Sequence, residues 1–245
     1  MSYLTCLNCG KDLTDYQRMR KNTFCCKGCA TSFRQKASDL NPFKEENELK
    51  YYLLGLIFAD GNLSKSQNSY RLSIRLNDLD LISLLYPLFS DTSKRIIYKE
   101  EFLVKNKLKP SYLIINSNLE AIDICRYFGI TERKSLTMLF PSIPDIFLKD
   151  FIRGYFDGDG SVFISSKYKD TVYLGVTFTS GSKKFLEVLQ KILLKHSISS
   201  SLLTDYRGHS YILRIYKQEE IKIFRNFIYD SSNYYLTRKK DIFYQ

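Results

Sequence analysis

Hydrophobic residues along this chain form two short helical blocks that are near-copies of one another. The first block is residues 53–61 (LLGLIFADG) and the second is residues 152–160 (IRGYFDGDG). Each block has two small residues four positions apart, which are Gly55 with Ala59 and Gly154 with Gly158. Residues at this spacing share one face of a helix. We therefore predict two helices whose bare faces let their backbones approach closely, as small residues do in packed helix pairs.

The pattern around each block predicts one order of elements twice. In the first half we expect a helix over 48–60, strands near 61–64 and over 70–76, a helix over 78–89 begun by an Asp78 cap, strands over 94–104 and 111–116 joined by a basic loop, and a helix over 119–128. In the second half we expect a helix over 147–159, strands over 161–166 and 172–179, a helix over 183–195, strands over 201–206 and 211–216, and a helix over 219–228. This duplication predicts an α+β fold with pseudo-twofold symmetry and the two block helices at its axis.

Each block ends in an acid, Asp60 or Asp159, and these two residues are 99 positions apart. A carboxylate is disfavoured in the last turn of a helix because the helix dipole is negative there, and two carboxylates brought together disfavour each other further. A hard divalent cation with oxygen ligands would stabilise the pair, and Mg²⁺ is the natural candidate. For either block alone, the alternative is an independent helix that ends in a polar Asp-Gly turn. Two copies in register favour a shared site.

The two blocks resemble the paired signature motifs of the LAGLIDADG homing endonucleases, in the single-chain form that carries both copies. The resemblance extends from about residue 48 to the C-terminus. It implies a duplicated αββαββα fold with two antiparallel, saddle-shaped sheets. By this resemblance, Asp60 and Asp159 match the metal-binding acids of the family, and Gly61 and Gly160 are candidate backbone-carbonyl ligands. Phe58 stands where the family often has a first Asp, but that position is not a metal ligand.

The family also has one lysine per half close to each scissile phosphate, where a cation stabilises the charge that develops during cleavage. Lys134 and Lys239, each preceded by an arginine after the last predicted helix of its half, are the matching candidates. The alternative is that these lysines only pair with phosphate or with solvent. The resemblance therefore gives Asp60, Asp159, Lys134 and Lys239 as the candidate catalytic residues.

The first 36 residues contain five of the six cysteines. Cys6 and Cys9 form a Cys-x-x-Cys turn, and the second cluster is spaced from it as in small four-cysteine zinc sites. The partner of Cys29 is either Cys25 or Cys26. We prefer Cys25, because Phe-Cys-x-x-x-Cys resembles the end of treble-clef-like fingers. A disulfide-stapled extracellular module is the competing explanation, and the absence of a signal peptide and a lone cysteine elsewhere argue against it.

The composition indicates a folded core and the kind of molecule that the protein binds. The 245 residues are 44% hydrophobic, which supports a substantial core, and their formal net charge of +11 favours nucleic acid as a polyanionic partner. The sequence lacks a long apolar run and a secretory signal pattern, so we expect an intracellular protein in a reducing compartment, not secreted and without membrane contact. The resemblance to the single-chain form, which carries both motif copies, implies a monomer. The expected organisation is a zinc-finger-like segment over 1–37, a linker over 38–47, and two halves over 48–145 and 146–245.

Each predicted sheet has one face covered by helices, and its other face is available to water or to a ligand. Two such sheets side by side form a saddle, and two-stranded ribbons fit the major groove of B-DNA. Basic residues on strands often only solubilise an exposed face, so each is a candidate for DNA contact and not an assignment. The candidates are Lys65, Arg71, Arg75, Lys94, Arg95, Lys99, Lys167, Lys169, Arg207, Arg214 and Lys217.

These features together predict a site-specific double-strand DNA endonuclease of the homing type. It would hydrolyse phosphodiester bonds with Mg²⁺ held by Asp60 and Asp159, leave short 3′ extensions at a long, partly asymmetric target, and carry structural Zn²⁺ in its finger. One alternative is an intron RNA maturase on the same fold, and another is a non-cleaving zinc-finger DNA-binding regulator. Retention of both acids favours cleavage. Residence in an intein is not expected, because no splicing blocks flank the repeat.

Overall fold

The structure is a computed structural model in which residues 5–6, 8–20, 22, 24–38, 40–66, 69–90, 98–104, 107–132, 138–169, 171–205, 208 and 210–244 are described. Side chains are described for these residues except 33–38, 66, 69, 98–104 and 107–109. Two small N-terminal helices, α1 (Asp15–Met19) and α2 (Lys27–Ser38), precede the main body of the chain.

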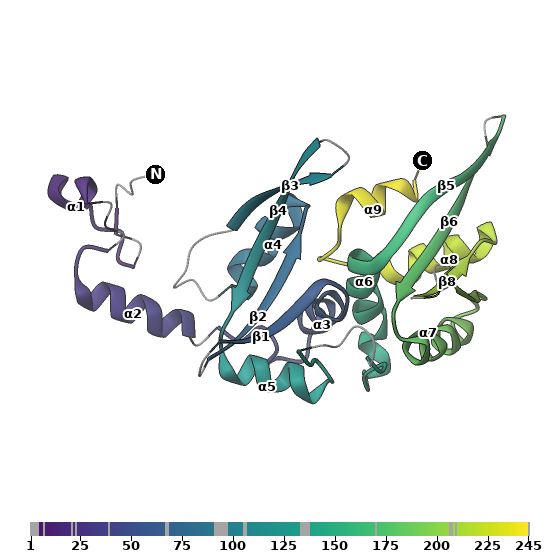
Figure 1. The fold of residues 1–245 in the computed structure, drawn as a ribbon, viewed down its shortest axis with the longest axis horizontal. Helices are drawn as coiled ribbons and strands as arrows, with labels where there is room; N and C mark the ends of the chain where they lie inside the picture. The colour runs from purple at the N-terminus through teal and green to yellow at the C-terminus, as the bar shows by residue number, and fades with distance from the viewer. Residues whose placement is uncertain are drawn as a thin grey trace.

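The main body contains one arrangement of elements twice (Figure 1). The first copy is α3 (Glu48–Asp60), β1 (Gly61–Ser66), β2 (Ser69–Leu76), α4 (Leu79–Phe89), β3 (Tyr98–Val104), β4 (Lys107–Asn116) and α5 (Leu119–Tyr127). The second copy is α6 (Leu148–Asp159), preceded by the short 3-10 turn η3 (Asp145–Phe147), then β5 (Gly160–Tyr168), β6 (Thr171–Ser180), α7 (Lys183–Lys195), β7 (Ser201–Thr204), β8 (Tyr211–Ile215) and α8 (Gln218–Tyr229). The predicted duplicated α+β fold is confirmed.

The two sheets have equivalent topology and register. Their strand orders are β1-β2-β4-β3 and β5-β6-β8-β7, and all the neighbouring strands are antiparallel. Gly61, directly after α3, pairs with Ile74, and Gly160, directly after α6, pairs with Phe178. Each motif helix therefore leads directly into an edge strand of its own sheet, β1 or β5. The two sheets lie on either side of the α3–α6 pair (Figure 1).

The two motif helices pack backbone to backbone, as the small residues predict. A Cβ added to Gly55 would lie 2.0 Å from the carbonyl oxygen of Phe151, and one added to Gly154 would lie 2.0 Å from the carbonyl oxygen of Tyr52. These two contacts are related by the same 99-position offset as the motif acids. Only residues without a Cβ allow this approach, so the two glycines fix the crossing point of the helices at the pseudo-twofold axis.

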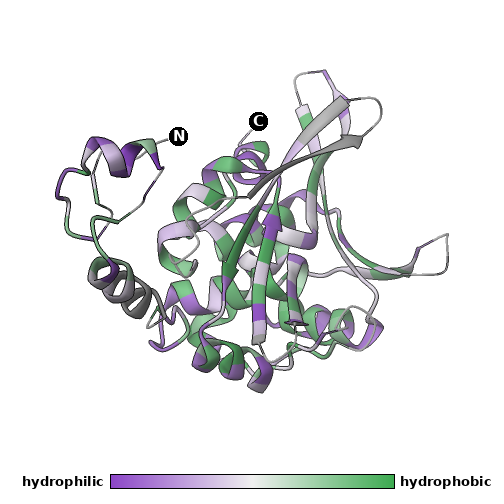
Figure 2. Ribbon diagram, turned by 60° about the vertical axis from the view of Figure 1, so that its left-hand side comes forward, coloured by the Kyte–Doolittle hydropathy of each residue, from purple (hydrophilic) through white to green (hydrophobic). Residues whose placement is uncertain are grey.

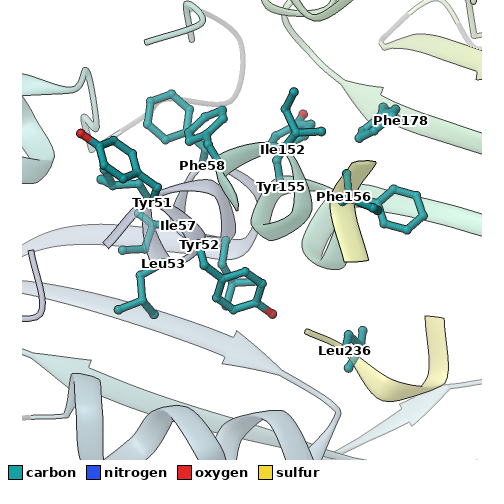
Figure 3. Close-up of a cluster of buried hydrophobic side chains, with 14 of the residues drawn as sticks. Tyr51, Tyr52, Leu53, Ile57, Phe58, Ile152, Tyr155, Phe156, Phe178 and Leu236 are labelled. Atoms are coloured by element: carbon teal, nitrogen blue, oxygen red, sulfur yellow. The ribbon is translucent and has the colours of Figure 1, made fainter. Parts of the chain in front are cut away.

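The core surrounds this helix pair and extends under both sheets (Figure 3). Along β2, Leu72, Ile74 and Leu76 are buried, whereas the alternate residues Arg71 and Arg75 are not. Hydrophobic and hydrophilic residues thus alternate along β2, as expected for a sheet with one face packed against helices. Both kinds of residue are visible along the strands in Figure 2. Of the helices in the described chain, none is long and apolar enough to cross a membrane.

Four local expectations differ from the structure. Within the described chain, the Asp78 carboxylate caps no N–H group of α4; it accepts hydrogen bonds from Arg238 at 2.6 and 3.1 Å. Strand β4 begins at Lys107, inside the expected basic loop, and pairs with β3 through Pro110. A further helix, α9 (Thr237–Ile242), follows α8. In the expected linker, Phe43 is fully buried and packs edge-on against Phe89.

Candidate metal and nucleic-acid site

The motif acids lie side by side at the ends of the crossed helices. Asp60 is the last residue of α3 and Asp159 the last residue of α6, and both are exposed. A Cβ added to Gly158 would lie 2.3 Å from the Cβ of Ala59 and 3.1 Å from Oδ2 of Asp60. Burial raises the pKa of Tyr155, and the negative charges of Asp159 and Asp60 raise it further. The Gly158 backbone, directly before Asp159, therefore lies close to the Asp60 carboxylate.

The composition of this acid pair fits a hard divalent cation. Two exposed carboxylates meet at the carbonyl ends of two helices, so the local field is negative, and the single Lys239 ammonium bound to the last carbonyls of α6 offsets only part of it. Mg²⁺ is commonly held by one or two carboxylates and completes its octahedral shell with water and substrate phosphate oxygens. Asp60 and Asp159 would hold such an ion.

A hollow extends from Asp60 across the open face of the first sheet. Its volume is about 460 Å³, and its lining residues are Asp60, Asn62, Ser64, Arg71, Ser73, Arg75, Leu113 and Ile115. All the strand residues in this set come from alternate positions of β1, β2 and β4 and face away from the buried side chains of the sheet. An acid at one end of a polar, cationic hollow provides a place for a phosphate backbone next to a metal site.

The candidate basic residues divide between the two faces of the sheets. Arg71, Arg75 and Arg214 occupy open-face positions, and the Nε atom of Arg214 is buried with no hydrogen-bond partner in the described chain. The expectation that Lys65 shares this face is wrong. Lys65 pairs with Tyr70 and lies over its ring at 5.4 Å, on the face that carries buried Leu63 and Leu72.

The other basic candidates lie elsewhere. The expectation that Lys167 lies on the open face is also wrong. Lys167 pairs with Val172 of β6, and Val172 lines a cavity together with residues of α8. Lys169 lies in the turn after β5, and the Lys217 ammonium is paired with Glu220 at 3.1 Å. Lys94, Arg95 and Arg207, together with the candidate catalytic Lys134, are outside the described residues, and only the backbone of Lys99 is described.

Lys239 has an unexpected environment. Its buried ammonium donates to the carbonyl oxygens of Phe156 (2.7 Å), Asp157 (2.7 Å), Gly158 (3.1 Å) and Gly160 (2.6 Å), and so caps the C-terminal end of α6. Burial lowers the pKa of Lys239 to about 8, against the opposing effect of nearby carboxylates that include Asp157, Asp60 and Asp159. The Gly160 carbonyl, a candidate metal ligand, is thus already bound to an ammonium. A direct role of Lys239 at a phosphate stays a prediction.

Sequence reasoning missed Asp157, which is 1% exposed. Its carboxylate accepts hydrogen bonds from the hydroxyls of Tyr52 (2.9 Å) and Tyr229 (3.0 Å) and from the backbone N–H of Leu236 (2.8 Å). The available signal was its position in the motif, where the first copy has Phe58. An acid at an otherwise apolar, buried position requires donors from elsewhere in the fold.

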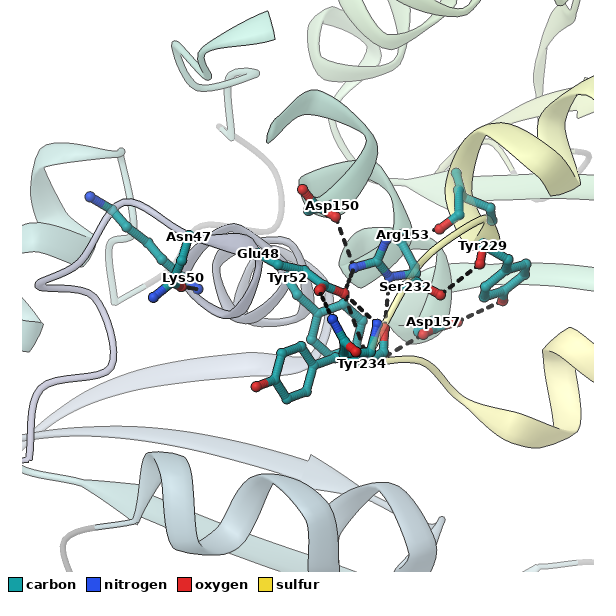
Figure 4. A network of polar contacts seen from close by, with 12 residues as sticks. Asn47, Glu48, Lys50, Tyr52, Asp150, Arg153, Asp157, Tyr229, Ser232 and Tyr234 are labelled. Carbon is teal, nitrogen blue, oxygen red and sulfur yellow. Dashed lines mark hydrogen bonds and ion pairs between the residues drawn. The ribbon is translucent and has the colours of Figure 1, made fainter. Parts of the chain in front are cut away.

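A second polar cluster, centred on the buried Arg153, joins the N-terminal halves of the motif helices (Figure 4). The fully buried Arg153 guanidinium contacts Glu48 at 2.7 Å and Asp150 at 2.9 Å, and it donates to the carbonyl oxygens of Ile228 and Tyr234. Glu48 also accepts from the backbone and side-chain amides of Asn233, at 2.8 and 2.7 Å. This cluster ties α3 of the first half to α6 and the C-terminal segment of the second.

The N-terminal cysteines converge as the motif spacing predicts. The Sγ atoms of Cys6, Cys9, Cys25 and Cys29 all lie within 4.8 Å of one another. Cys26 is outside this set, and its Sγ accepts the N–H of Cys29 at 3.3 Å at the start of α2. Desolvation would raise the pKa of Cys6, but the backbone N–H groups of Cys25, Cys9 and Asn8 outweigh it and lower the pKa to about 6. This geometry favours Cys25 over Cys26 as a ligand.

Comparisons with known proteins agree with this architecture. Residues 147–229 match the family model of a LAGLIDADG-like domain. The homing endonuclease I-WcaI, solved bound to its DNA recognition sequence, is similar to this chain with a TM-score of 0.59 and 14% identity, over 88% of this chain and 92% of that one. The LAGLIDADG homing endonuclease I-GzeII, solved in complex with its DNA target, has a TM-score of 0.50 and 14% identity, over 81% and 88% of the two chains.

One curated relative is a probable translation initiation factor IF-2 from Thermococcus kodakarensis, which is 29% identical over 190 residues. The match covers 75% of this chain and 14% of that protein, so the chain spans about a seventh of the relative's length. The comparisons therefore show the fold of the LAGLIDADG homing endonuclease structures. This chain has the LAGLIDADG homing endonuclease fold in its single-chain form, with a LAGLIDADG-like domain at residues 147–229 and a four-cysteine cluster near its N-terminus.

Proposed function

We propose that this protein is a divalent-metal-dependent, site-specific DNA endonuclease of the homing type that acts as a monomer. The observation that carries the proposal is the paired exposure of Asp60 and Asp159 at the meeting ends of α3 and α6, beside the polar hollow of the first sheet. Duplex DNA laid across the two open faces would bring its phosphates to the acid pair. The two similar structures that were solved with DNA support duplex DNA as the ligand.

The chemistry assigned to the site is phosphodiester hydrolysis. Asp60 and Asp159 would hold a divalent ion, and such an ion would supply activation of the attacking water and charge stabilisation for the leaving 3′ oxygen. The residues of the chain bind and orient the duplex: Arg71, Arg75 and Arg214 contact phosphates or base edges from the open faces. A long, partly asymmetric target is expected, since the open faces of the two halves differ in sequence. Short 3′ extensions are the products that the resemblance to homing endonucleases implies.

Charge removal at the acid pair tests the proposal. Asp60→Asn or Asp159→Asn is expected to abolish double-strand cleavage while leaving DNA binding within about threefold of wild type, because the amide keeps the shape of the side chain but is a poor ligand for Mg²⁺. The assay is cleavage of a randomised duplex library in Mg²⁺ or EDTA, with sequencing of the ends. Asp145→Asn, an exposed acid in η3, is the matched control.

Full double-strand cleavage by either acid variant would contradict the metal-site assignment. A wild-type protein that binds duplex DNA or structured RNA without cutting any library member in Mg²⁺ would replace the nuclease with a binding function on the same fold.

We also propose that the four-cysteine cluster binds structural Zn²⁺. Tetrahedral zinc with Zn–S bonds of about 2.3 Å places neighbouring sulfurs roughly 3.8 Å apart. The Cys9–Cys25 and Cys25–Cys29 sulfur separations are 3.7 and 3.5 Å, far longer than the ~2.05 Å of a disulfide bond. The expected zinc content is about one per chain, lost in Cys25→Ser and retained in Cys26→Ser, measured by elemental analysis of purified protein. A metal-free wild type would overturn this assignment.

A further inference from the structure

The two motif helices differ in chemistry at three related positions. With the 99-position offset, buried Asp150, Arg153 and Asp157 of α6 correspond to buried Tyr51, Leu54 and Phe58 of α3. On the α3 side, Tyr51 stacks on Phe147 at 4.6 Å between ring centroids, and Phe58 contacts the ring of Phe151 at 5.2 Å. The pseudo-twofold interface therefore has one aromatic side and one polar side.

On the polar side, the C-terminal segment encloses the last turn of α6. Tyr229 and Leu236 donate to the Asp157 carboxylate, and Tyr52 adds a donor from α3. The Lys239 ammonium shares its three N–H groups among four carbonyls of residues 156–160. The last carbonyls of a helix have no partner inside the helix, so this lysine satisfies groups that would otherwise need water or a metal.

These contacts are costly to disrupt because they are buried. Removal of one member leaves a desolvated carboxylate, ammonium or set of carbonyls without its partner, which is penalised more than the loss of a surface contact. The equivalent position in α3 is the apolar Phe58, which packs against rings and accepts no hydrogen bonds. The two halves therefore hold the ends of their motif helices by different means.

We propose that Asp157 and Lys239 are positioning residues for Asp159, through which the C-terminal segment (residues 229–243) fixes one of the two motif acids independently of the other. The proposal rests on the nuclease function proposed above for its catalytic consequence, but its structural consequence is independent of any activity. Asp159 is the second residue after Asp157, and Lys239 binds the carbonyls on both sides of it. We call the hydrogen bonds to the Asp157 carboxylate and those from Lys239 to the last carbonyls of α6 the α6 cage. Loss of this cage lets the Asp159 carboxylate leave its place beside Asp60.

The first test uses hydrogen exchange of the full chain. The N–H of Gly160 bonds to the Phe156 carbonyl, and its pseudo-twofold counterpart, the N–H of Gly61, bonds to the Ile57 carbonyl. In Lys239→Met, exchange in peptides containing Gly160 is expected to accelerate at least about tenfold, with peptides containing Gly61 unchanged. Lys222→Met, which removes an exposed ammonium of α8 paired with Glu219 at 3.0 Å, is the matched control and is expected to change neither.

Tyr229→Phe provides a milder variant in case Lys239→Met does not fold. It keeps the ring and removes only the hydroxyl that donates to Asp157, and it is expected to accelerate exchange at Gly160 in the same selective way. The proposal would be overturned if both folded variants accelerated exchange equally at Gly160 and Gly61 relative to wild type. It would also be overturned if neither variant changed exchange at either glycine.

The second test resolves the two DNA strands. On a cleavable duplex with a different label on each strand, Tyr229→Phe is expected to change the ratio of the two single-turnover cleavage rates at least about tenfold and to accumulate one nicked species, because displacement of a catalytic group by an ångström has effects of this size or larger. Equal loss on both strands would contradict independent positioning. If the wild type cuts no DNA, the nuclease proposal fails and the exchange experiment still decides whether the cage exists.

Discussion

At the scale of single residues, the surroundings of a side chain decide its role more than its type does. Cys25 and Cys26 are adjacent and chemically identical, yet only the Cys25 sulfur points into the four-cysteine set, and the Cys26 sulfur accepts the N–H of Cys29. The pattern of a Cys-x-x-x-Cys at a helix start was sufficient to prefer Cys25. The motif spacing therefore located the candidate zinc ligands before the structure did.

The cysteines are expected to differ sharply in reactivity. Cys26 is exposed and outside the sulfur cluster, whereas Cys125 is buried, and burial raises the pKa of its thiol. In zinc-loaded native protein, limiting N-ethylmaleimide is expected to modify Cys26 first and Cys125 only after unfolding, because the reactive form is an accessible thiolate. Peptide mapping by mass spectrometry measures this order. Modification of Cys25 before Cys26 would reverse the ligand assignment.

Other residue-level features depend on contacts that no local pattern contains. Asp78 looks like a helix cap, but its partner Arg238 is 160 positions away in a helix that the polar sequence TRKKDI did not predict. Lys239 follows the last predicted helix and was a candidate for contact with a phosphate, and only the fold shows that it is buried against α6. Asp157 was visible in the motif, but its three donors come from α3, α8 and the C-terminal segment.

At the scale of elements, the internal duplication of the sequence predicted most of the helices and strands. The bounds of α3 and α7 match the expected ranges, and strand alternation gave the correct buried face of β2. The same alternation, applied to β1, places Lys65 on the covered face with Leu63, because side chains two positions apart in a strand share a face. The charge of Lys65 alone did not indicate which face it occupies. The motif glycines predicted the contact between α3 and α6, because small residues on one helical face let two backbones approach closely.

Substitution of either motif glycine is expected to be strongly destabilising. An alanine at Gly55 or Gly154 would place its Cβ 2.0 Å from a carbonyl oxygen of the facing helix, so the helices must separate. We expect each variant to lower the free energy of unfolding by about 3 kcal/mol, although alanine alone favours a helix by about 1 kcal/mol. Urea denaturation measures the change.

Gly28→Ala is the matched control for the two motif substitutions. Gly28 is helical, and its added Cβ meets its nearest neighbour at 3.8 Å, an ordinary contact. Its expected effect on stability is neutral or slightly favourable. Equal stability of Gly55→Ala, Gly154→Ala and Gly28→Ala would show that the motif helices do not depend on close backbone contact.

At the scale of the whole molecule, the two sheets lie on either side of the α3–α6 pair, whose last residues are the motif acids (Figure 1). The open faces of the two sheets are not equivalent. By the sheet registers, Arg71 and Arg75 in the first half correspond to Gly175 and Thr179 in the second, and Ile115 corresponds to Arg214. A single chain can hold such different halves together, and a target recognised by them would have unlike half-sites.

The two faces of the first sheet give a direct test of how DNA is bound. Arg75 is on the open face and lines the hollow beside Asp60, whereas Lys65 is on the covered face over Tyr70. Each phosphate contact releases counterions, so its loss lowers the slope of log affinity against log salt concentration by about 1. We therefore expect Arg75→Ala and Arg71→Ala each to weaken duplex binding and reduce this slope. We expect Lys65→Ala, which removes the same charge from the other face, to change neither.

Fluorescence anisotropy over a salt series measures both the affinity and the slope. If Arg75→Ala weakens binding without changing the slope, the guanidinium contacts a base edge, and if Lys65→Ala has the larger effect, the DNA does not lie on the open face.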